Sequence, residues 1–153
     1  MLPIALSVAG REVAPLGFGV PLRLGDLVPG DSPWEIELGF GKGRFLLAQA
    51  AAHPQRRFLG VEQVSEYYRL VQRRAGRLCL GNLAVLRGEA VYLAAALLPR
   101  ACAAAVHIYF PDPWPKTRHR HRRLFDPGTV DLVLGLLAPA GEHGPPGARE
   151  HRA

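Results

Sequence analysis

Three glycines, Gly39, Gly41 and Gly43, lie between an apolar stretch and a segment of helical composition. In an open sheet of alternating strands and helices, a glycine loop at this place lets the backbone approach a nucleotide-like ligand. The spacing is GxGxG, whereas dinucleotide-binding folds carry GxGxxG. Glu37 stands just ahead of the loop, where its carboxylate would repel a pyrophosphate and attract an ammonium or sulfonium group. The loop therefore favours S-adenosylmethionine over a nicotinamide dinucleotide, with an ordinary glycine-rich turn as the alternative.

Two further acids lie just after predicted strands, and Glu37 lies near the end of one. Glu62 closes an apolar stretch 19 residues beyond Gly43, a spacing at which an acid can accept hydrogen bonds from both ribose hydroxyls. Glu89 follows the next predicted strand, where it could meet the amino group of an adenine ring. Each could instead be a solvated carboxylate at a strand end, but their conjunction with the glycine loop favours ligand binding.

Another site candidate is Asp112, which lies among Pro111, Pro113, Trp114 and Pro115. Proline fixes the backbone angle φ, so three prolines around one aspartate and one tryptophan hold the chain stiffly. A site that needs a carboxylate at a fixed position requires such a stiff backbone, whereas an ordinary surface turn rarely has this composition. We therefore predict a functional loop, in which Trp114 braces the backbone.

A run of basic residues begins shortly after Asp112. It contains five fixed positive charges and no acid, and its basic and histidine residues are Lys116, Arg118, His119, Arg120, His121, Arg122 and Arg123. Charge runs are usually solvated loops, but this density beside a ligand site indicates binding of nucleic acid through its phosphates. Because the two histidines have no third ligand in the sequence nearby, we predict that they neighbour phosphates and that no metal is bound.

The whole chain is basic and of ordinary hydrophobicity. It has 153 residues, 48% of them hydrophobic, which suits one globular domain. Nineteen basic and thirteen acidic residues give a net charge of +6 and a pI near 10.0, so we expect a polyanionic partner. No apolar run reaches the roughly 18 residues of a membrane span, and the first residues lack a secretory signal. We therefore expect a cytoplasmic protein without membrane contact.

The elements that must position these residues alternate between strands and helices. Their order predicts a parallel, right-handed βαβ sheet of the α/β class. We expect strands at 34–38, 57–61, 83–87 and 104–110, and helices at 45–52, 64–78, 91–98 and 126–138. Residues 1–33, which contain five prolines, are expected to form a lead-in of short strands or extended chain. Residues 34–138 then form the domain, and residues 139–153 a disordered tail.

In these motifs, residues 34–140 resemble the bacterial tRNA (guanine-N7-)-methyltransferase family, which modifies the variable loop of tRNA. The most specific match is the segment from Phe110 to His119 with Arg122 and Arg123, which is similar to the family signature almost letter for letter. The resemblance implies a Rossmann-like class I S-adenosylmethionine-dependent methyltransferase sheet. It also implies S-adenosylmethionine as cofactor and tRNA as partner.

The resemblance further assigns roles to the acidic and basic residues. Glu37, Glu62 and Glu89 would contact S-adenosylmethionine, and Asp112 would be the catalytic and cofactor-adjacent acid. Lys116 would contact the substrate, and the segment from Arg118 to Arg123, including its two histidines, would touch tRNA. Glu89 stands where the family usually has aspartate.

The resemblance ends shortly after Ala140. Family members continue beyond the helix at 126–138 with three more strands, a substrate-binding aspartate and a Thr-x-x-Glu motif, none of which this sequence carries. A truncation or a shifted reading frame would explain this difference. We expect a sheet that lacks its last strands, with an exposed apolar edge at 104–110. Such a chain would be marginally folded and at best a weak methyltransferase.

The implied chemistry needs little from the protein, because guanine N7 already presents a lone pair. Asp112 would orient the guanine and stabilise the developing cation, without acting as a general base at N7. Two alternatives remain open. A non-catalytic RNA-binding remnant of the same fold would keep the basic run but tolerate loss of Glu37 and Glu62. An NAD-dependent oxidoreductase fragment is disfavoured by Glu37, by the GxGxG spacing and by the basic run.

Overall fold

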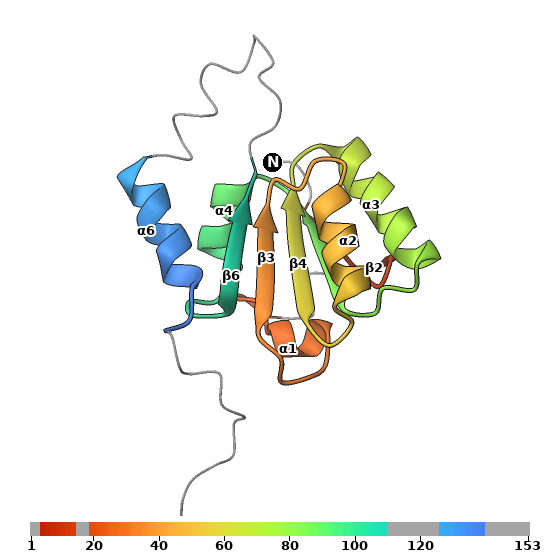
Figure 1. Ribbon diagram of the computed structural model, residues 1–153. Coiled ribbons are helices and arrows are strands. Elements are labelled where there is room, and N and C mark those ends of the chain that lie inside the picture. Colours follow the sequence, from red (N-terminus) through yellow and green to blue (C-terminus); the bar gives the residue numbers. More distant parts are fainter. Residues whose placement is uncertain (1–3, 15–18, 110–125, 140–153) are drawn as a thin grey trace, which may run out of the picture.

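The structure, a computed structural model, describes residues 4–14, 19–109 and 126–139. These residues form a six-stranded sheet in the order β2-β1-β5-β4-β3-β6, with helices on both of its faces (Figure 1). The strands are β1 (Ala5–Val8), β2 (Arg11–Val13), β3 (Trp34–Leu38), β4 (Arg57–Glu62), β5 (Leu83–Arg87) and β6 (Ala103–Ile108). The helices are α1 (Leu24–Leu27), α2 (Arg44–Ala52), α3 (Ser65–Arg77), α4 (Ala90–Ala96) and α6 (Pro127–Leu136).

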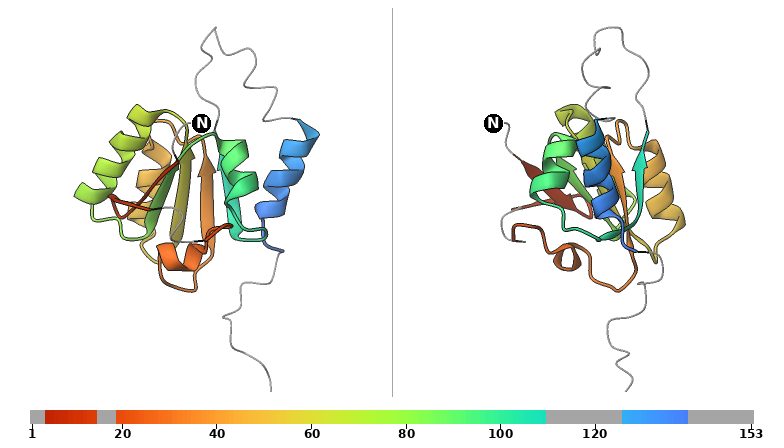
Figure 2. Two further views of the ribbon diagram at one scale, coloured as in Figure 1. Left: turned by 180° about the vertical axis from the view of Figure 1, so that it is seen from behind. Right: turned by 90° about the vertical axis from the view of Figure 1, so that its left-hand side faces the viewer.

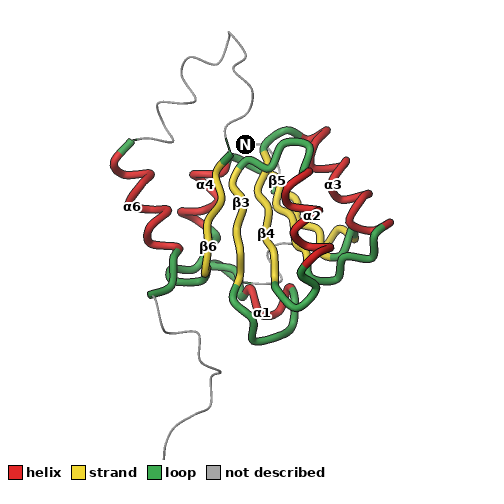
Figure 3. The backbone as a smooth tube through the Cα atoms, viewed as in Figure 1, coloured by secondary structure: helices red, strands yellow, loops and turns green. Residues whose placement is uncertain are grey.

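The alternating strands and helices predicted from the sequence are all present. Strands β3 and β5 have the predicted bounds, and the other predicted elements differ by at most two residues at either end. Strands β3, β4, β5 and β6 run parallel to one another, which confirms the α/β class. The backbone trace shows their carboxyl ends at one edge of the sheet, where the chain turns into α2 and α3 (Figure 3).

The sheet is mixed and not wholly parallel, because the first strands form a hairpin at its other edge. Strand β1 pairs antiparallel with both β2 and β5. The two-residue loop between β1 and β2 holds Ala9 and Gly10 at positive φ, 51° and 79°, as a tight hairpin turn requires. A side chain at Gly10 would come within 2.5 Å of the Gly76 backbone, so the hairpin lies tightly against α3. Short strands were expected in this region. Their antiparallel pairing at the edge of the main sheet was not predicted.

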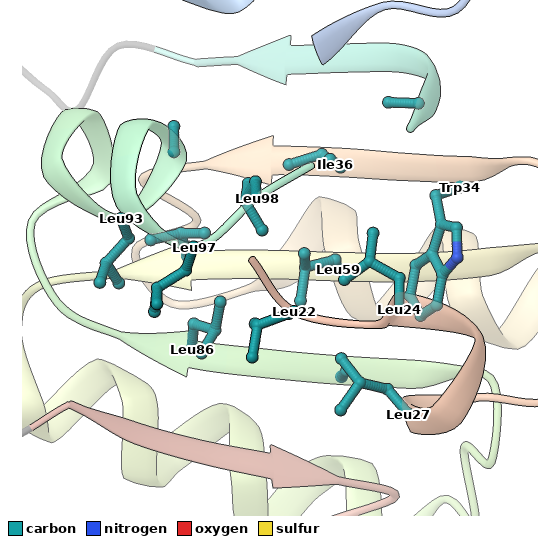
Figure 4. Packing of buried hydrophobic residues seen from close by; sticks show 14 of the residues in the cluster. Leu22, Leu24, Leu27, Trp34, Ile36, Leu59, Leu86, Leu93, Leu97 and Leu98 are labelled. Carbon is teal, nitrogen blue, oxygen red and sulfur yellow. The ribbon is translucent and has the colours of Figure 1, made fainter. Parts of the chain in front are cut away.

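Side chains alternate along the strands and divide the core into two layers. Trp34, Ile36 and Leu38 of β3 point to the face covered by α1, α4 and α6, where they pack with leucines of the helices and of neighbouring strands (Figure 4). Phe58 of β4 and Val85 of β5 point to the face covered by α2 and α3. The two helical layers lie on opposite sides of the sheet (Figure 2). Residues 35 and 37 therefore face the α2 side.

Strand β6 forms an edge of the described sheet. It pairs with β3 over its whole length, and the only described residue on its other side is Leu137, which forms a parallel bridge to Ala103. The next residue, Ala138, donates its N–H to the Ala103 carbonyl at 2.8 Å. The apolar composition of 104–110 by itself predicts a buried strand, which is wrong: Ala104 is exposed and residues 105–108 are half-buried, in agreement with the exposed edge expected there. This pattern is typical of an edge strand that pairs with another strand on one side only.

The helices of the described residues are short, and none is long and apolar enough to cross a membrane. Helix α6 begins where Asp126 and Pro127 predict. An aspartate before a proline predicts a side-chain cap, but the Asp126 side chain makes no capping hydrogen bond. Its backbone carbonyl instead accepts from the N–H groups of Thr129 and Val130. The boundary therefore rests on Pro127 and the backbone.

Candidate active site at the carboxyl ends of the strands

The glycine loop joins β3 to α2 and contains three glycines in the left-handed backbone conformation. Gly39, Gly41 and Gly43 have φ of 76°, 55° and 71°, which residues with side chains rarely adopt. At Gly43 an added Cβ would lie 2.3 Å from Cγ2 of Val71 in α3, so the glycine lets the loop pack against that helix. At Gly39 and Gly41 an added Cβ would meet no atom within 4 Å. The outer part of the loop thus presents bare backbone to open space, as approach of a ligand requires.

Glu37 lies in β3 directly before the loop and is 3% exposed. Among the described residues, its Oε2 is buried without a hydrogen-bond partner. Burial and, to a smaller extent, the charge of Glu62 together raise the pKa of Glu37 to about 7. An unpartnered buried carboxylate is costly, so this position suits a ligand that brings a positive charge or a hydrogen-bond donor.

Glu62 ends β4 and is 8% exposed. Its Oε2 accepts the N–H of Gly41 at 2.7 Å, and its Oε1 accepts the N–H of Val64 at 2.9 Å. The carboxylate therefore fixes the glycine loop from the neighbouring strand. Each oxygen can accept a second hydrogen bond, so this role leaves room for the predicted contact with a ribose.

Glu89 is exposed and occupies the N-cap position of α4. Its Oε1 accepts from Val91 N–H at 3.1 Å and its Oε2 from Tyr92 N–H at 2.7 Å, which satisfies two backbone donors of the first turn. Glu89 was predicted to contact the cofactor, and its capping role was not predicted from the sequence. A cofactor contact of Glu89 stays a prediction.

Replacing Glu89 with alanine is expected to lower the free energy of unfolding by about 1 kcal/mol, the usual cost of losing an N-cap. Aspartate caps helices well, so Glu89→Asp should keep most of the stability. Urea unfolding measures both variants, with Glu66→Ala as a control that removes an exposed acid from the first turn of α3. Equal losses for Glu89→Ala and Glu89→Asp would contradict the capping role.

Glu37, Glu62 and the glycine loop meet where the order of strands reverses. After β3 the chain continues to β4 and β5 on one side, while β6 pairs with β3 on the other. The crevice outside the carboxyl ends at such a point is where open α/β sheets bind their ligands. The structure therefore brings together Glu37, Glu62, Gly39, Gly41 and Gly43 of the predicted site.

A group of side chains that the sequence analysis did not single out lies beside this crevice, on the α2 face. The carboxylate of Glu35 accepts from Arg56 Nη1 at 2.9 Å and lies 3.0 Å from His107 Nε2. The ring of Phe45 packs against those of His107 and Tyr109, with centroids 5.0 Å and 4.8 Å apart. Period-two alternation places His107 and Tyr109 on one face. The register of β6 on β3 sets His107 opposite Glu37, and its contact with Glu35 is diagonal, which the local sequence pattern does not predict.

Asp112 and the basic residues from Lys116 to Arg123 lie outside the described residues. Strand β6 ends at Ile108, at the same edge of the sheet as Glu37 and Glu62. Tyr109 is the last described residue before the segment that carries Asp112. The described residues contain no cluster of three or more metal-ligating side chains.

Comparison with solved structures defines the class of the fold. The 16S rRNA (adenine(1408)-N(1))-methyltransferase from Catenulisporales acidiphilia, solved with its cosubstrate S-adenosylmethionine, superposes with a TM-score of 0.60. The likeness covers 90% of this chain and 59% of that one at 19% sequence identity. The sheet order, the glycine loop and this likeness define the α/β, Rossmann-like fold of S-adenosylmethionine-dependent methyltransferases, which confirms the predicted fold.

Comparison with known sequences assigns the chain to a narrower group within this fold. The model of the family described as "Putative methyltransferase" matches residues 31–143, and the chain belongs to this family. It is 40% identical over 110 residues to the tRNA (guanine-N(7)-)-methyltransferase of Thiobacillus denitrificans, covering 72% of this chain and 48% of that protein. It is 45% identical over 107 residues to the enzyme of the same description from Anaeromyxobacter dehalogenans, covering 70% and 53%. The chain thus spans about half the length of the curated relatives it matches.

Proposed function

We propose that the chain takes part in the transfer of a methyl group from S-adenosylmethionine to guanine N7 in the variable loop of tRNA. The observation that carries this proposal is the pair of buried acids, Glu37 and Glu62, around an open glycine loop at the strand reversal. The names of the relatives supply the proposed acceptor, tRNA guanine. Because tRNA is the proposed substrate, the proposed place of action is the cytoplasm.

The described residues fit S-adenosylmethionine. Its cationic groups suit the unpartnered oxygen of Glu37, and its ribose hydroxyls suit the free acceptor capacity of Glu62. The bare backbone at Gly39 and Gly41 allows close approach of a ligand to the loop. A pyrophosphate would instead meet two carboxylates, which disfavours a dinucleotide. When bound, S-adenosylmethionine supplies an electrophilic methyl group on a sulfonium.

The proposed work of the protein is to position the guanine. Guanine N7 carries an available lone pair, so no proton has to leave before attack. Asp112 is proposed to orient the base through its ring N–H groups and to stabilise the positive charge that develops on it. Lys116 is proposed to contact the substrate, and the residues from Arg118 to Arg123 the phosphates of tRNA. Orientation of the two reactants then provides most of the rate enhancement.

Glu62 gives a direct test of the cofactor site. Glu62→Ala is expected to weaken binding of S-adenosylhomocysteine by about 1 to 3 kcal/mol, the range for losing charged hydrogen bonds. Part of this loss arises because the N–H groups of Gly41 and Val64 lose their acceptor and the loop loosens. Titration calorimetry measures the affinity, and Glu66→Ala serves as a control outside the site. Unchanged affinity in a folded Glu62→Ala variant would remove Glu62 from the site.

The proposed activity is tested by methyl transfer from labelled S-adenosylmethionine to unmodified tRNA. The expected product is 7-methylguanine in the variable loop, identified by nucleoside analysis of the digested RNA. Methylation of another base atom would contradict the proposed acceptor. Binding of tRNA without any methyl transfer would instead favour the non-catalytic RNA-binding alternative.

A further inference from the structure

Helix α3 carries a stripe of arginines on its outer face. Arg69, Arg73 and Arg77 follow one another at intervals of four residues, and all three are exposed. The buried residues of the helix, Tyr68, Val71 and Ala75, lie on the opposite side, against the sheet. These three arginines, called the α3 stripe below, therefore point away from the protein body.

The α3 stripe has no ion-pair partner among the described residues. Of the exposed arginines elsewhere, Arg23 pairs with Asp26 at 2.7 Å and Arg56 pairs with Glu35 at 2.9 Å. Single exposed arginines such as Arg11, Arg44 and Arg100 form no ion pair among the described residues, but they do not line up on one helix face as the α3 stripe does. Like charges four residues apart destabilise an isolated helix. The helix dipole favours Arg77 in the last turn, but it offers no such compensation for Arg69 and Arg73. The stripe is thus an unneutralised surface that an anion would stabilise.

The positive charge of the chain is concentrated in two segments. One is the segment from 110 to 125, and the other is α3, which has four arginines and a single acid, Glu66. All remaining residues together carry ten basic and eleven acidic side chains. The excess of +6 therefore comes wholly from these two segments, which indicates that both contact a polyanion.

Helix α3 and the carboxyl end of β6 lie on opposite sides of the candidate active site. Helix α3 begins three residues after Glu62 and packs on β4 and β5. Strand β6, which leads to residue 110, lies at the far edge of the sheet from these strands (Figure 1). Nucleic acid with its target base beside a cofactor held by Glu37 and Glu62 could thus extend over α3 on the side away from β6. From Arg69 to Arg77 the helix rises about 12 Å, enough for about three phosphates of one strand.

We propose that the α3 stripe binds the sugar-phosphate backbone of the substrate RNA, as an anchor separate from the segment that contains Asp112. This inference rests on the proposed function, which supplies RNA as the polyanion. A lipid surface fits less well, because an interfacial helix exposes apolar residues, whereas the apolar side chains of α3 face the sheet. Guanidinium groups on one helix face contact phosphates without reading sequence, so the anchor is indifferent to the bases.

The test compares two double variants with the same change in charge. Arg69→Gln with Arg73→Gln removes two charges from the α3 stripe, and Arg23→Gln with Arg100→Gln removes two exposed arginines elsewhere. Glutamine and arginine have similar helix propensities, so α3 is expected to remain folded. Binding of unmodified tRNA is measured over a series of salt concentrations, and binding of S-adenosylhomocysteine is measured alongside.

The stripe variant is expected to bind tRNA roughly 10- to 50-fold more weakly at about 0.1 M salt, with a slope of log K against log salt flatter by about 1.4 to 1.8. The control variant should stay within about twofold of the original chain and keep its slope. Arg69→Lys with Arg73→Lys should also keep the slope, because the charges remain. Binding of S-adenosylhomocysteine should be equal in all of these proteins.

Three outcomes would overturn the inference, and they are distinguishable. If the original chain binds tRNA and the stripe variant matches the control, the anchor is wrong while the proposed function stands. If the original chain binds no tRNA at all, the proposed function fails and the anchor fails with it. If the α3 stripe is needed only for binding to vesicles of phosphatidylserine and phosphatidylcholine, the partner is a membrane and the proposal is wrong.

Discussion

Glu37→Gln is expected to remove a pH dependence of stability that the original chain shows between pH 4.5 and about 7. Burial raises the pKa of Glu37 from 4.5 in the unfolded chain to about 7 in the folded one, with the charge of Glu62 adding to the shift. The folded state therefore binds more protons than the unfolded state in this range, so stability falls as pH rises through it. The loss of stability reaches about 3 kcal/mol above the folded pKa of about 7, and it is absent below pH 4.5.

Urea unfolding over a series of pH values measures this effect as a difference between the two proteins. The stability of the original chain relative to Glu37→Gln should decrease from pH 4.5 to about 7 and be constant outside that window. Glu66→Gln, which changes an exposed acid on α3, should give a nearly constant difference. Parallel curves for the original chain and Glu37→Gln would show that folding does not raise the pKa of Glu37.

Gly43→Ala is expected to lower the free energy of unfolding by about 2 to 4 kcal/mol. A left-handed φ of 71° costs alanine about 1 kcal/mol, and overpacking against Val71 adds about 1 to 3 kcal/mol. The added Cβ would otherwise lie 2.3 Å from Val71 Cγ2, so either the loop or α3 has to move. Because the loop also holds Gly41 against Glu62, affinity for S-adenosylhomocysteine should fall with stability.

Gly39→Ala is the matched control for this prediction. Its φ of 76° imposes the same backbone strain, but an added Cβ would meet no atom within 4 Å. It should therefore lose only about 1 kcal/mol of stability. In the double variant Gly43→Ala with Val71→Ala, the steric part of the loss should be relieved. Equal losses at Gly39 and Gly43 would contradict the close packing of the loop on α3.

The sequence predicted those parts of the fold that local pattern decides. The apolar runs at 34–38 and 83–87 give strands with the predicted bounds, and the arginines of 65–77 lie outside as their spacing indicates. The place of β1 could not be predicted in this way. Its antiparallel pairing with β5 depends on contacts between residues 5–8 and 84–87, which are distant in the sequence. The partial exposure of β6 likewise depends on which strands flank it.

The candidate site was predicted as a set of residues but not as a set of contacts. The glycine spacing and the acids at strand ends placed Glu37 and Glu62 beside one loop, and the structure agrees. The hydrogen bonds of Glu62 to Gly41 and Val64 depend on how β4 lies against the loop. Glu89 was assigned to the cofactor because it follows a strand, yet the same position is the N-cap of the next helix. Sequence alone could not separate these two roles.

The central claim is that the glycine loop with Glu37 and Glu62 binds S-adenosylmethionine. Titration calorimetry of the same chain at neutral pH with S-adenosylmethionine and with NAD tests it most directly. S-adenosylmethionine is expected to bind with a stoichiometry of one, and NAD should give no saturable heat, because its pyrophosphate would face two carboxylates. Glu37→Gln should weaken the binding of S-adenosylmethionine by about tenfold or more, which is the usual cost of a lost charged hydrogen bond. Binding of NAD as tight as that of S-adenosylmethionine, or no loss in Glu37→Gln, would contradict the claim.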